Sequence, residues 1–83
     1  MTAPNETSIA PLATESLLEY RVRRGWRRAC HLAVATTPRL DPALLSRMEN
    51  GRRSPHGEEL LARFFGITHS EMELLVLNGR RLR

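Results

Sequence analysis

The sequence contains no lysine: all 13 basic residues are arginine, and against 9 acidic residues they leave a net charge of +4. Arginine makes forked hydrogen bonds to phosphate and guanine, but a modest positive charge alone does not identify a partner. Cys30 is the single cysteine, which excludes an internal disulfide framework and is typical of a reducing cytoplasm. No apolar run approaches the ~18 residues of a membrane span, and the N-terminus lacks the apolar core of a signal peptide. These absences favour a cytoplasmic protein.

The chain has 83 residues, enough for one small domain that buries about 60–65% of its unfolded surface, so dimerisation would add to a marginal stability. We expect a flexible arm over residues 1–13, where only Ile9 and Leu12 are sizeable apolar residues. The alternative is an arm that docks on a partner subunit through those two residues. A folded domain over residues 14–78 and a basic tail over 79–83 complete the chain, the tail being either solvated or in contact with phosphate.

Helical spacing of apolar residues predicts an all-α fold, a compact five-helix bundle with no strand pattern. The first helix is expected over residues 14–24, capped at Thr14 or by a Ser16–Glu19 capping box. Its inner side is expected to consist of Leu17, Tyr20 and Arg21, together with Leu18. The second is expected over residues 27–35. Its predicted apolar stripe consists of Trp26, Cys30, Ala33 and Val34.

The third predicted helix has both ends marked. Asp41 is a suitable N-cap and Pro42 fits the first helical position, while Asn50–Gly51 predicts a left-handed stop. One side is apolar and therefore buried; the other carries Ser46 and Arg47. An apolar back with a small, arginine-bearing front favours a DNA-binding helix. The residues of the buried side are Leu44, Leu45 and Met48.

Two further helices follow. One begins after Ser54–Pro55 and ends at Gly66, with a core face of Leu61, Phe64 and Phe65. The other opens with a Thr68–Glu71 capping box and is expected to end at Asn78–Gly79. Met72, Leu75 and Val76 form one apolar stripe, whereas Leu74 and Leu77 lie on nearly the opposite side, and either side could meet a second subunit. Because so small a domain cannot bury both sides, we expect Leu74 and Leu77 to form a dimer interface.

Arg27 and Arg28 stand at the predicted start of the second helix, where cations oppose the helix dipole. Two unfavourably placed cations in a row suggest that an external anion binds there, because amide donors and guanidinium groups would converge on a phosphate. The alternative is a solvated pair of charges on the surface.

Taken together, these residues resemble the Cro/C1-type (XRE-like) helix-turn-helix family. The resemblance covers residues 17–75. It rests on Leu17-x-x-Tyr20–Arg21-x-x-x-Gly25–Trp26, on residues 40–55 (LDPALLSRMENGRRSP) and on residues 61–68 (LARFFGIT). The segment 25–40 is longer than the family's usual pattern and the segment 55–66 is shorter, so the turn into the third helix must be extended and the fourth helix trimmed.

The family's fold implies a lambda-repressor-like bundle with the third helix in the major groove of DNA. It further implies an ion pair between Arg21 and Glu49. Arg28 lies near the family's phosphate-binding position at the start of the second helix. The resemblance and the charge pattern together assign phosphate contacts to Arg27, Arg28, Asn50, Arg52 and Arg53. The positions implied to face base edges or the groove wall are Asp41, Pro42, Ala43, Leu44, Ser46 and Arg47.

Among the base-facing positions, Arg47 can make a forked contact with guanine, worth ~1–3 kcal/mol of discrimination. Leu44 or Ala43 could meet a thymine methyl, and Asp41 could accept from cytosine. This set makes few hydrogen bonds, so DNA shape and phosphate contacts are expected to supply much of the specificity. We therefore expect a transcriptional regulator that binds a pseudo-palindromic operator as a homodimer and that could contact RNA polymerase or another regulator. Repression by blocking polymerase is the expected outcome, and activation through contact with polymerase is the alternative.

The sequence argues against an enzyme. Cys30 and His31 are adjacent on a helix and diverge by about 100°, which spoils a nucleophile–base pair. The three histidines have no metal-ligand spacing, so no metal or cofactor is expected. The rival hypothesis is a protein-binding helix-turn-helix module, such as an antiactivator or antitoxin, favoured by the second apolar side of the last helix and the sparse base-reading set.

Overall fold

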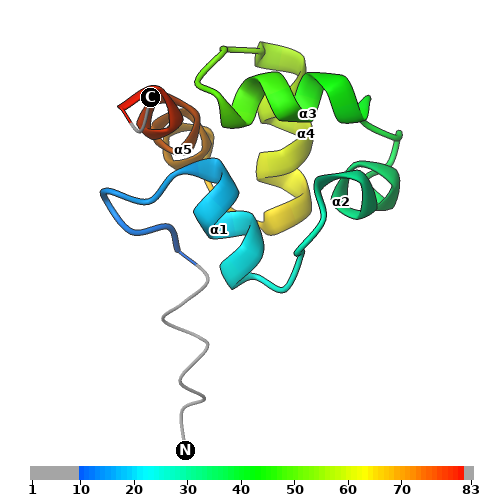
Figure 1. Cartoon of the computed structure of the whole chain (residues 1–83), viewed down its shortest axis with the longest axis horizontal. Coiled ribbons are helices and arrows are strands. Elements are labelled where there is room, and N and C mark those ends of the chain that lie inside the picture. The colour runs from blue at the N-terminus through cyan, green and yellow to red at the C-terminus, as the bar shows by residue number, and fades with distance from the viewer. Residues whose placement is uncertain (1–9, 82–83) are drawn as a thin grey trace, which may run out of the picture.

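The computed structural model describes residues 10–81, and over that range the backbone forms five helices and no strand (Figure 1). The prediction of an all-α fold is therefore confirmed. Two parts of the chain lie outside the described residues: residues 1–9 of the proposed arm, which include Ile9, and residues 82–83 of the proposed tail. The helices are α1 (Leu17–Arg23), α2 (Ala29–Ala35), α3 (Pro42–Glu49), α4 (Pro55–Phe65) and α5 (His69–Arg81).

Adjacent polar residues set where most helices begin. Ser16 caps α1, since its hydroxyl accepts from the Glu19 amide while the Glu19 carboxylate accepts from the Ser16 amide. The cap is thus Ser16 and not Thr14. Asp41 caps α3 by accepting from the Ala43 amide at 3.1 Å. Thr68 and Glu71 form the corresponding reciprocal pair at the start of α5, as the sequence predicts.

The register of α2 differs from the prediction. Trp26 precedes the helix, which begins at Ala29 after an N-cap at Arg28, so helical spacing cannot be counted from the tryptophan. Cys30 and Val34, placed on the inner stripe by that count, are exposed, Val34 by 51%. Counting from the first helical residue gives the side that packs on the core, which consists of Ala29, Leu32 and Ala33.

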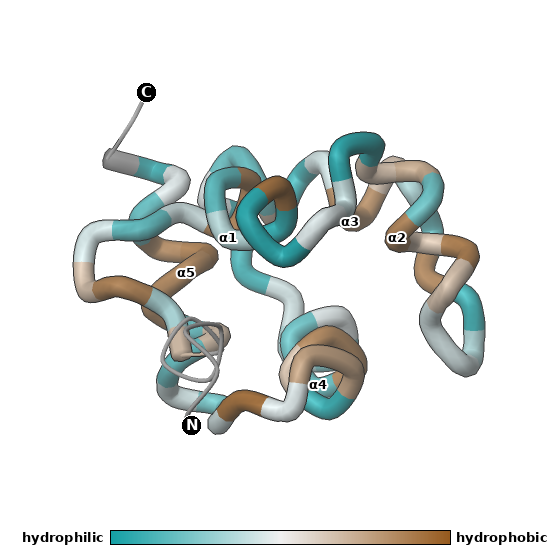
Figure 2. The backbone as a smooth tube through the Cα atoms, turned by 90° about the horizontal axis from the view of Figure 1, so that it is seen from below, coloured by the Kyte–Doolittle hydropathy of each residue, from teal (hydrophilic) through white to brown (hydrophobic). Residues whose placement is uncertain are grey.

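The core lies between α5 and the helices around it. Because α5 packs against α1, α3 and α4, its apolar side is fully enclosed (Figure 1). Figure 2 shows the corresponding apolar segments, in brown, along α2, α4 and α5. In turn, α3 contacts each of the other four helices, so its position is fixed from several directions. Fully buried core residues include Leu17, Tyr20, Leu32, Leu45, Met48, Leu61, Met72, Leu75 and Val76.

The expected stop at Asn78–Gly79 is wrong, because α5 continues to Arg81. Asn78 is buried, and its Nδ2 donates to the carbonyls of Ala13 and Glu15, 2.9 Å from each oxygen. The amide therefore anchors the chain just before α1. Gly79 does not have a positive φ; its role is close approach to another element and not a left-handed turn.

Two glycines bring the end of α3 and the last turns of α5 into backbone contact. A Cβ added at Gly79 would overlap the carbonyl oxygen of Glu49. A Cβ added at Gly51 would lie 2.7 Å from the Cβ of Arg80. No side chain separates the two segments, so the sequence permits this packing only with glycine at both positions.

We expect Gly79→Ala to destabilise the protein. In an unhindered helix interior the same change stabilises by about 1 kcal/mol, whereas overpacking here should lower the free energy of unfolding by about 1–3 kcal/mol. Urea denaturation followed by circular dichroism measures the difference. Ser70→Ala, at an exposed position of the same helix, is the control and should change stability by no more than about 0.5 kcal/mol. A stability for Gly79→Ala equal to or above that of the wild type would contradict the contact.

Candidate nucleic-acid interface

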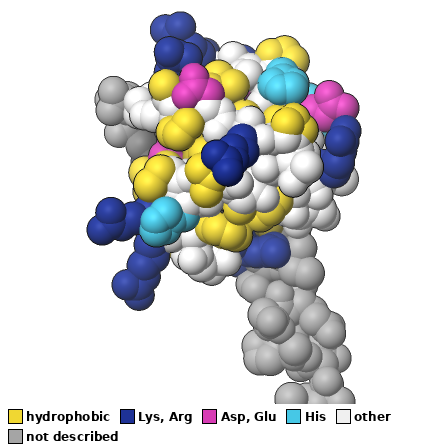
Figure 3. Space-filling view, turned by 90° about the vertical axis from the view of Figure 1, so that its right-hand side faces the viewer, with side chains coloured by type: hydrophobic (Ala, Val, Ile, Leu, Met, Phe, Trp, Pro, Cys, Tyr) yellow, Lys and Arg dark blue, Asp and Glu magenta, His cyan; other side chains and the backbone are white. Residues whose placement is uncertain are grey.

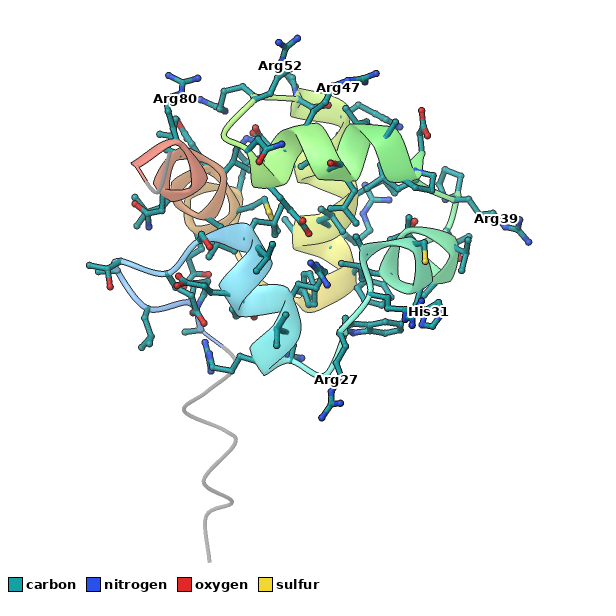
Figure 4. The ribbon with its side chains drawn as sticks, viewed as in Figure 1. Arg27, His31, Arg39, Arg47, Arg52 and Arg80 are labelled. Carbon is teal, nitrogen blue, oxygen red and sulfur yellow. The ribbon has the colours of Figure 1, made fainter. Side chains whose placement is uncertain are left out.

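Three exposed arginines from separate segments lie along one edge of the molecule (Figure 4). Arg47 is on α3, Arg52 is in the loop that follows it, and Arg80 is in the last turns of α5. The Arg52 amide donates to the Arg47 carbonyl at 3.0 Å, and Arg80 Nη2 donates to the Gly51 carbonyl at 3.1 Å. We call these three side chains the arginine ridge. They form a cationic strip that continues past the end of α3.

The turn that follows α3 builds the middle of this ridge. Gly51 has a φ of +95°, and its amide donates to the Met48 carbonyl while the next amide, of Arg52, donates to the Arg47 carbonyl. This pair of bonds is a Schellman motif. The chain turns at Gly51, and the backbone of Arg52 stays hydrogen-bonded to the last turn of α3.

The outer side of α3 is open to solvent and its inner side is not. Leu45 and Met48 are fully buried, and Leu44 is half-buried against the core. Leu44, predicted to face DNA, is thus partly committed to packing. The other predicted base-contacting residues, Asp41, Ala43, Ser46 and Arg47, are exposed.

A buried ion pair fixes the end of α3. Arg21 Nε lies 2.5 Å from Glu49 Oε2, and the two side chains are only 5% and 9% exposed. Arg21 Nη1 also donates to the carbonyls of Trp26 and Arg27, at 2.8 Å each. One guanidinium therefore joins α1, the loop before α2 and the end of α3. It also balances the charge of the Glu49 carboxylate.

Arg53, predicted to contact phosphate, is engaged within the protein. Its guanidinium makes a forked pair with Glu58, at 2.7 and 3.1 Å, and lies 3.2 Å from Glu73. It thereby ties the loop to α4 and α5. Burial acts to raise the pKa of the fully buried Glu58, but the hydrogen bonds from Arg53 and the Ser54 amide outweigh it and hold that pKa below its ordinary value.

The remaining predicted phosphate contacts are dispersed. Asn50 is exposed at the C-cap of α3, next to the ridge. Arg28 is exposed at the start of α2, where its side chain makes no capping bond. Arg27 points away from the molecule at the opposite edge from Arg47 and Arg52 (Figure 4). The structure does not bring Arg27 together with the ridge.

Apolar side chains are also exposed away from the ridge. A groove of about 520 Å³ runs along α1, and its apolar lining includes Leu12, Leu18 and Val22. Figure 3 shows a second face, where apolar side chains surround a basic one. On α5, Leu74 is 39% exposed and Leu77 is half-buried, so the predicted dimer contacts form a small patch.

Within residues 10–81, no three histidine, cysteine, aspartate or glutamate side chains lie close enough together to hold a metal ion. Over the same residues, every helix is too short or too polar to cross a bilayer.

The chain matches no protein-family model, and it has no significant match among curated proteins or solved structures.

We expect Arg21→Met to lower the free energy of unfolding by about 3–5 kcal/mol, because the buried Glu49 carboxylate would lose its counter-ion. Glu49→Gln should cost less, since it leaves the guanidinium bonded to the two carbonyls. The double variant should lose less than the sum of the two single losses, because neither charge remains unpaired. Urea denaturation of all four proteins measures the coupling. Unchanged melting of both single variants would contradict the pair's structural role.

Glu58→Gln should destabilise the protein at pH 7, and the deficit should shrink in acid. The carboxyl's folded pKa is below its ordinary 4.5, so its contribution is present above the unfolded pKa and is lost as the pH falls through the folded pKa. Denaturation midpoints between about pH 7 and pH 3 measure this. Glu59→Gln, an exposed neighbour on the same helix, is the control and should show a small, nearly constant difference. A Glu58→Gln deficit that persists unchanged at low pH would contradict the account.

Proposed function

We propose that the protein is a sequence-specific DNA-binding regulator of transcription that places α3 in the major groove, as its resemblance to the Cro/C1-type (XRE-like) family implies. One observation carries the proposal. The helix whose inner side packs into the core exposes Ser46 and Arg47 on its outer side, and the arginine ridge continues from that side past the end of the helix.

On this proposal the outer side of α3 reads base edges. Arg47 donates a forked pair of hydrogen bonds to guanine, and Ser46 bonds to a neighbouring base. Ala43 meets a thymine methyl. Asp41 Oδ1 already accepts from the Ala43 amide, which leaves its other carboxylate oxygen to accept from cytosine.

Phosphate contacts come from the turn after α3. Arg52 and Asn50 follow the reading helix directly and are exposed, and Arg28 can add a contact from the start of α2. Arg53 is excluded from this set by its pairing with Glu58 and Glu73. Phosphate contacts carry no sequence information but fix the register of the helix in the groove.

We further propose that the protein acts in the cytoplasm as a homodimer on a two-fold symmetric site, with half-sites about one helical turn apart. The exposed Leu74 of α5 and its neighbour Leu77 supply the subunit contact. Blocking of RNA polymerase by the bound dimer would make the protein a repressor.

A protein-binding module is the second candidate, and the apolar groove along α1 favours it. The side chains of Leu12, Leu18 and Val22 line this groove, and each is more than two fifths exposed. A protein partner bound in the groove would not contact the arginine ridge. Tight binding of a protein partner together with an absence of DNA binding at low salt would support this candidate over the first.

The test begins with selection of bound sites from a random pool of duplexes, followed by fluorescence anisotropy. Arg47→Ala should weaken binding to the selected site by about tenfold or more and binding to random duplex much less. Arg52→Ala should weaken both alike and make binding less dependent on salt. Equal losses on both duplexes for Arg47→Ala would remove it from the base-reading set. Failure to bind any duplex at low salt would overturn the proposal.

A further inference from the structure

We propose that the last turns of α5 form part of the DNA-contacting surface: Arg80 binds a backbone phosphate next to the one bound by Arg52, and Gly79 is the positioning residue that makes this possible. The inference rests on the proposed function and adds a residue set to it. Its ligand is the phosphate of a duplex backbone and not a base edge.

The Arg80 guanidinium is available to an external anion. Its side chain is exposed, and one of its five N–H groups is used by the Gly51 carbonyl. Among the described residues, no acidic side chain forms an ion pair with Arg80. The nearest acidic residue along α5, Glu73, pairs instead with Arg53. Arg80 therefore differs from Arg53, whose charge is balanced by Glu58 and Glu73.

The bond to Gly51 also aims Arg80 along the ridge. A carbonyl at 3.1 Å holds one edge of the guanidinium against the turn whose next residue is Arg52. In Figure 4 the side chains of Arg47, Arg52 and Arg80 project from the same edge of the molecule. The Arg80 side chain is thus held against the turn that carries Arg52, so on the proposed function both can contact the backbone of a bound duplex.

Gly79 sets how closely α5 approaches this turn. Because a Cβ at this position would overlap the Glu49 carbonyl oxygen, any larger residue would push the last turns of α5 away from the end of α3. Arg80 would move with them, away from Arg52. The glycine thus determines the spacing of two cations contributed by segments far apart in the sequence.

A purely structural role for Arg80 predicts different behaviour. A cation in the last turns of a helix interacts favourably with the helix dipole, and that interaction is the same with or without DNA. Loss of a dipole interaction would lower stability but leave the salt dependence of DNA binding unchanged. Salt dependence is the readout that separates the two roles.

The experiment measures binding of wild-type protein, Arg80→Gln, Arg80→Lys and Arg27→Gln to the selected duplex and to random duplex over a salt series. Arg80→Gln should weaken binding to both by about tenfold at low salt and reduce the slope of log K against log salt by about 0.9. Arg80→Lys keeps the charge and should retain most of the slope. Arg27→Gln removes the same charge from the opposite edge and should leave the slope unchanged.

A readout on the wild-type protein does not depend on how a variant folds. The Nε–Hε resonance of Arg80 should shift when the selected duplex is added, while that of Arg27 should not. Wild-type binding with an unmoved Arg80 resonance and an unchanged slope for Arg80→Gln would overturn this inference and leave the proposed function standing. Absence of salt-dependent binding by the wild-type protein would overturn both.

Discussion

The buried guanidinium of Arg21 connects α1, the loop before α2 and the end of α3. Arg21 reaches from α1 to the Glu49 carboxylate at the end of α3 and to two carbonyls just before α2. Hydrogen bonds of one side chain thereby fix three segments to one another. A buried pair of this kind is costly to break from one side, which makes it a geometric constraint more than a source of net stability.

The same glutamate takes part in a second constraint through its backbone. Its side chain pairs with Arg21, while its carbonyl lies directly against Gly79 of α5. The end of α3 is therefore held from α1 on one side and from α5 on the other. On the proposed function these two contacts leave α3 one orientation for reading bases, and both act where α3 passes into the arginine ridge.

Signals encoded by neighbouring residues could be predicted from the sequence. Asp41–Pro42, Asn50–Gly51 and Thr68–Glu71 each mark a helix end through bonds that span only a few residues, and those ends lie where the pattern placed them. The pairing of Arg21 with Glu49 came from the family resemblance, because nothing in the spacing of residues so far apart indicates it.

The predictions that were wrong concern residues whose roles are set by contacts with distant parts of the chain. Asn78–Gly79 has the composition of a helix stop, yet the surrounding tertiary structure uses it for a buried amide and a close approach. The adjacent Arg52 and Arg53 look equivalent in sequence, but one faces solvent and the other meets a buried carboxylate from α4. The inclusion of Arg80 in the ridge depends on α5 crossing the end of α3, which no local pattern specifies.

Mapping of backbone amide shifts in the labelled wild-type protein during titration with the selected duplex tests the central claim most directly. If α3 and the arginine ridge contact DNA, the largest shifts fall on residues 41–52, with a second group at Gly79 and Arg80. The groove lined by Leu12, Leu18 and Val22 then stays unperturbed. Largest shifts at that groove, or no shifts at all, would contradict the account.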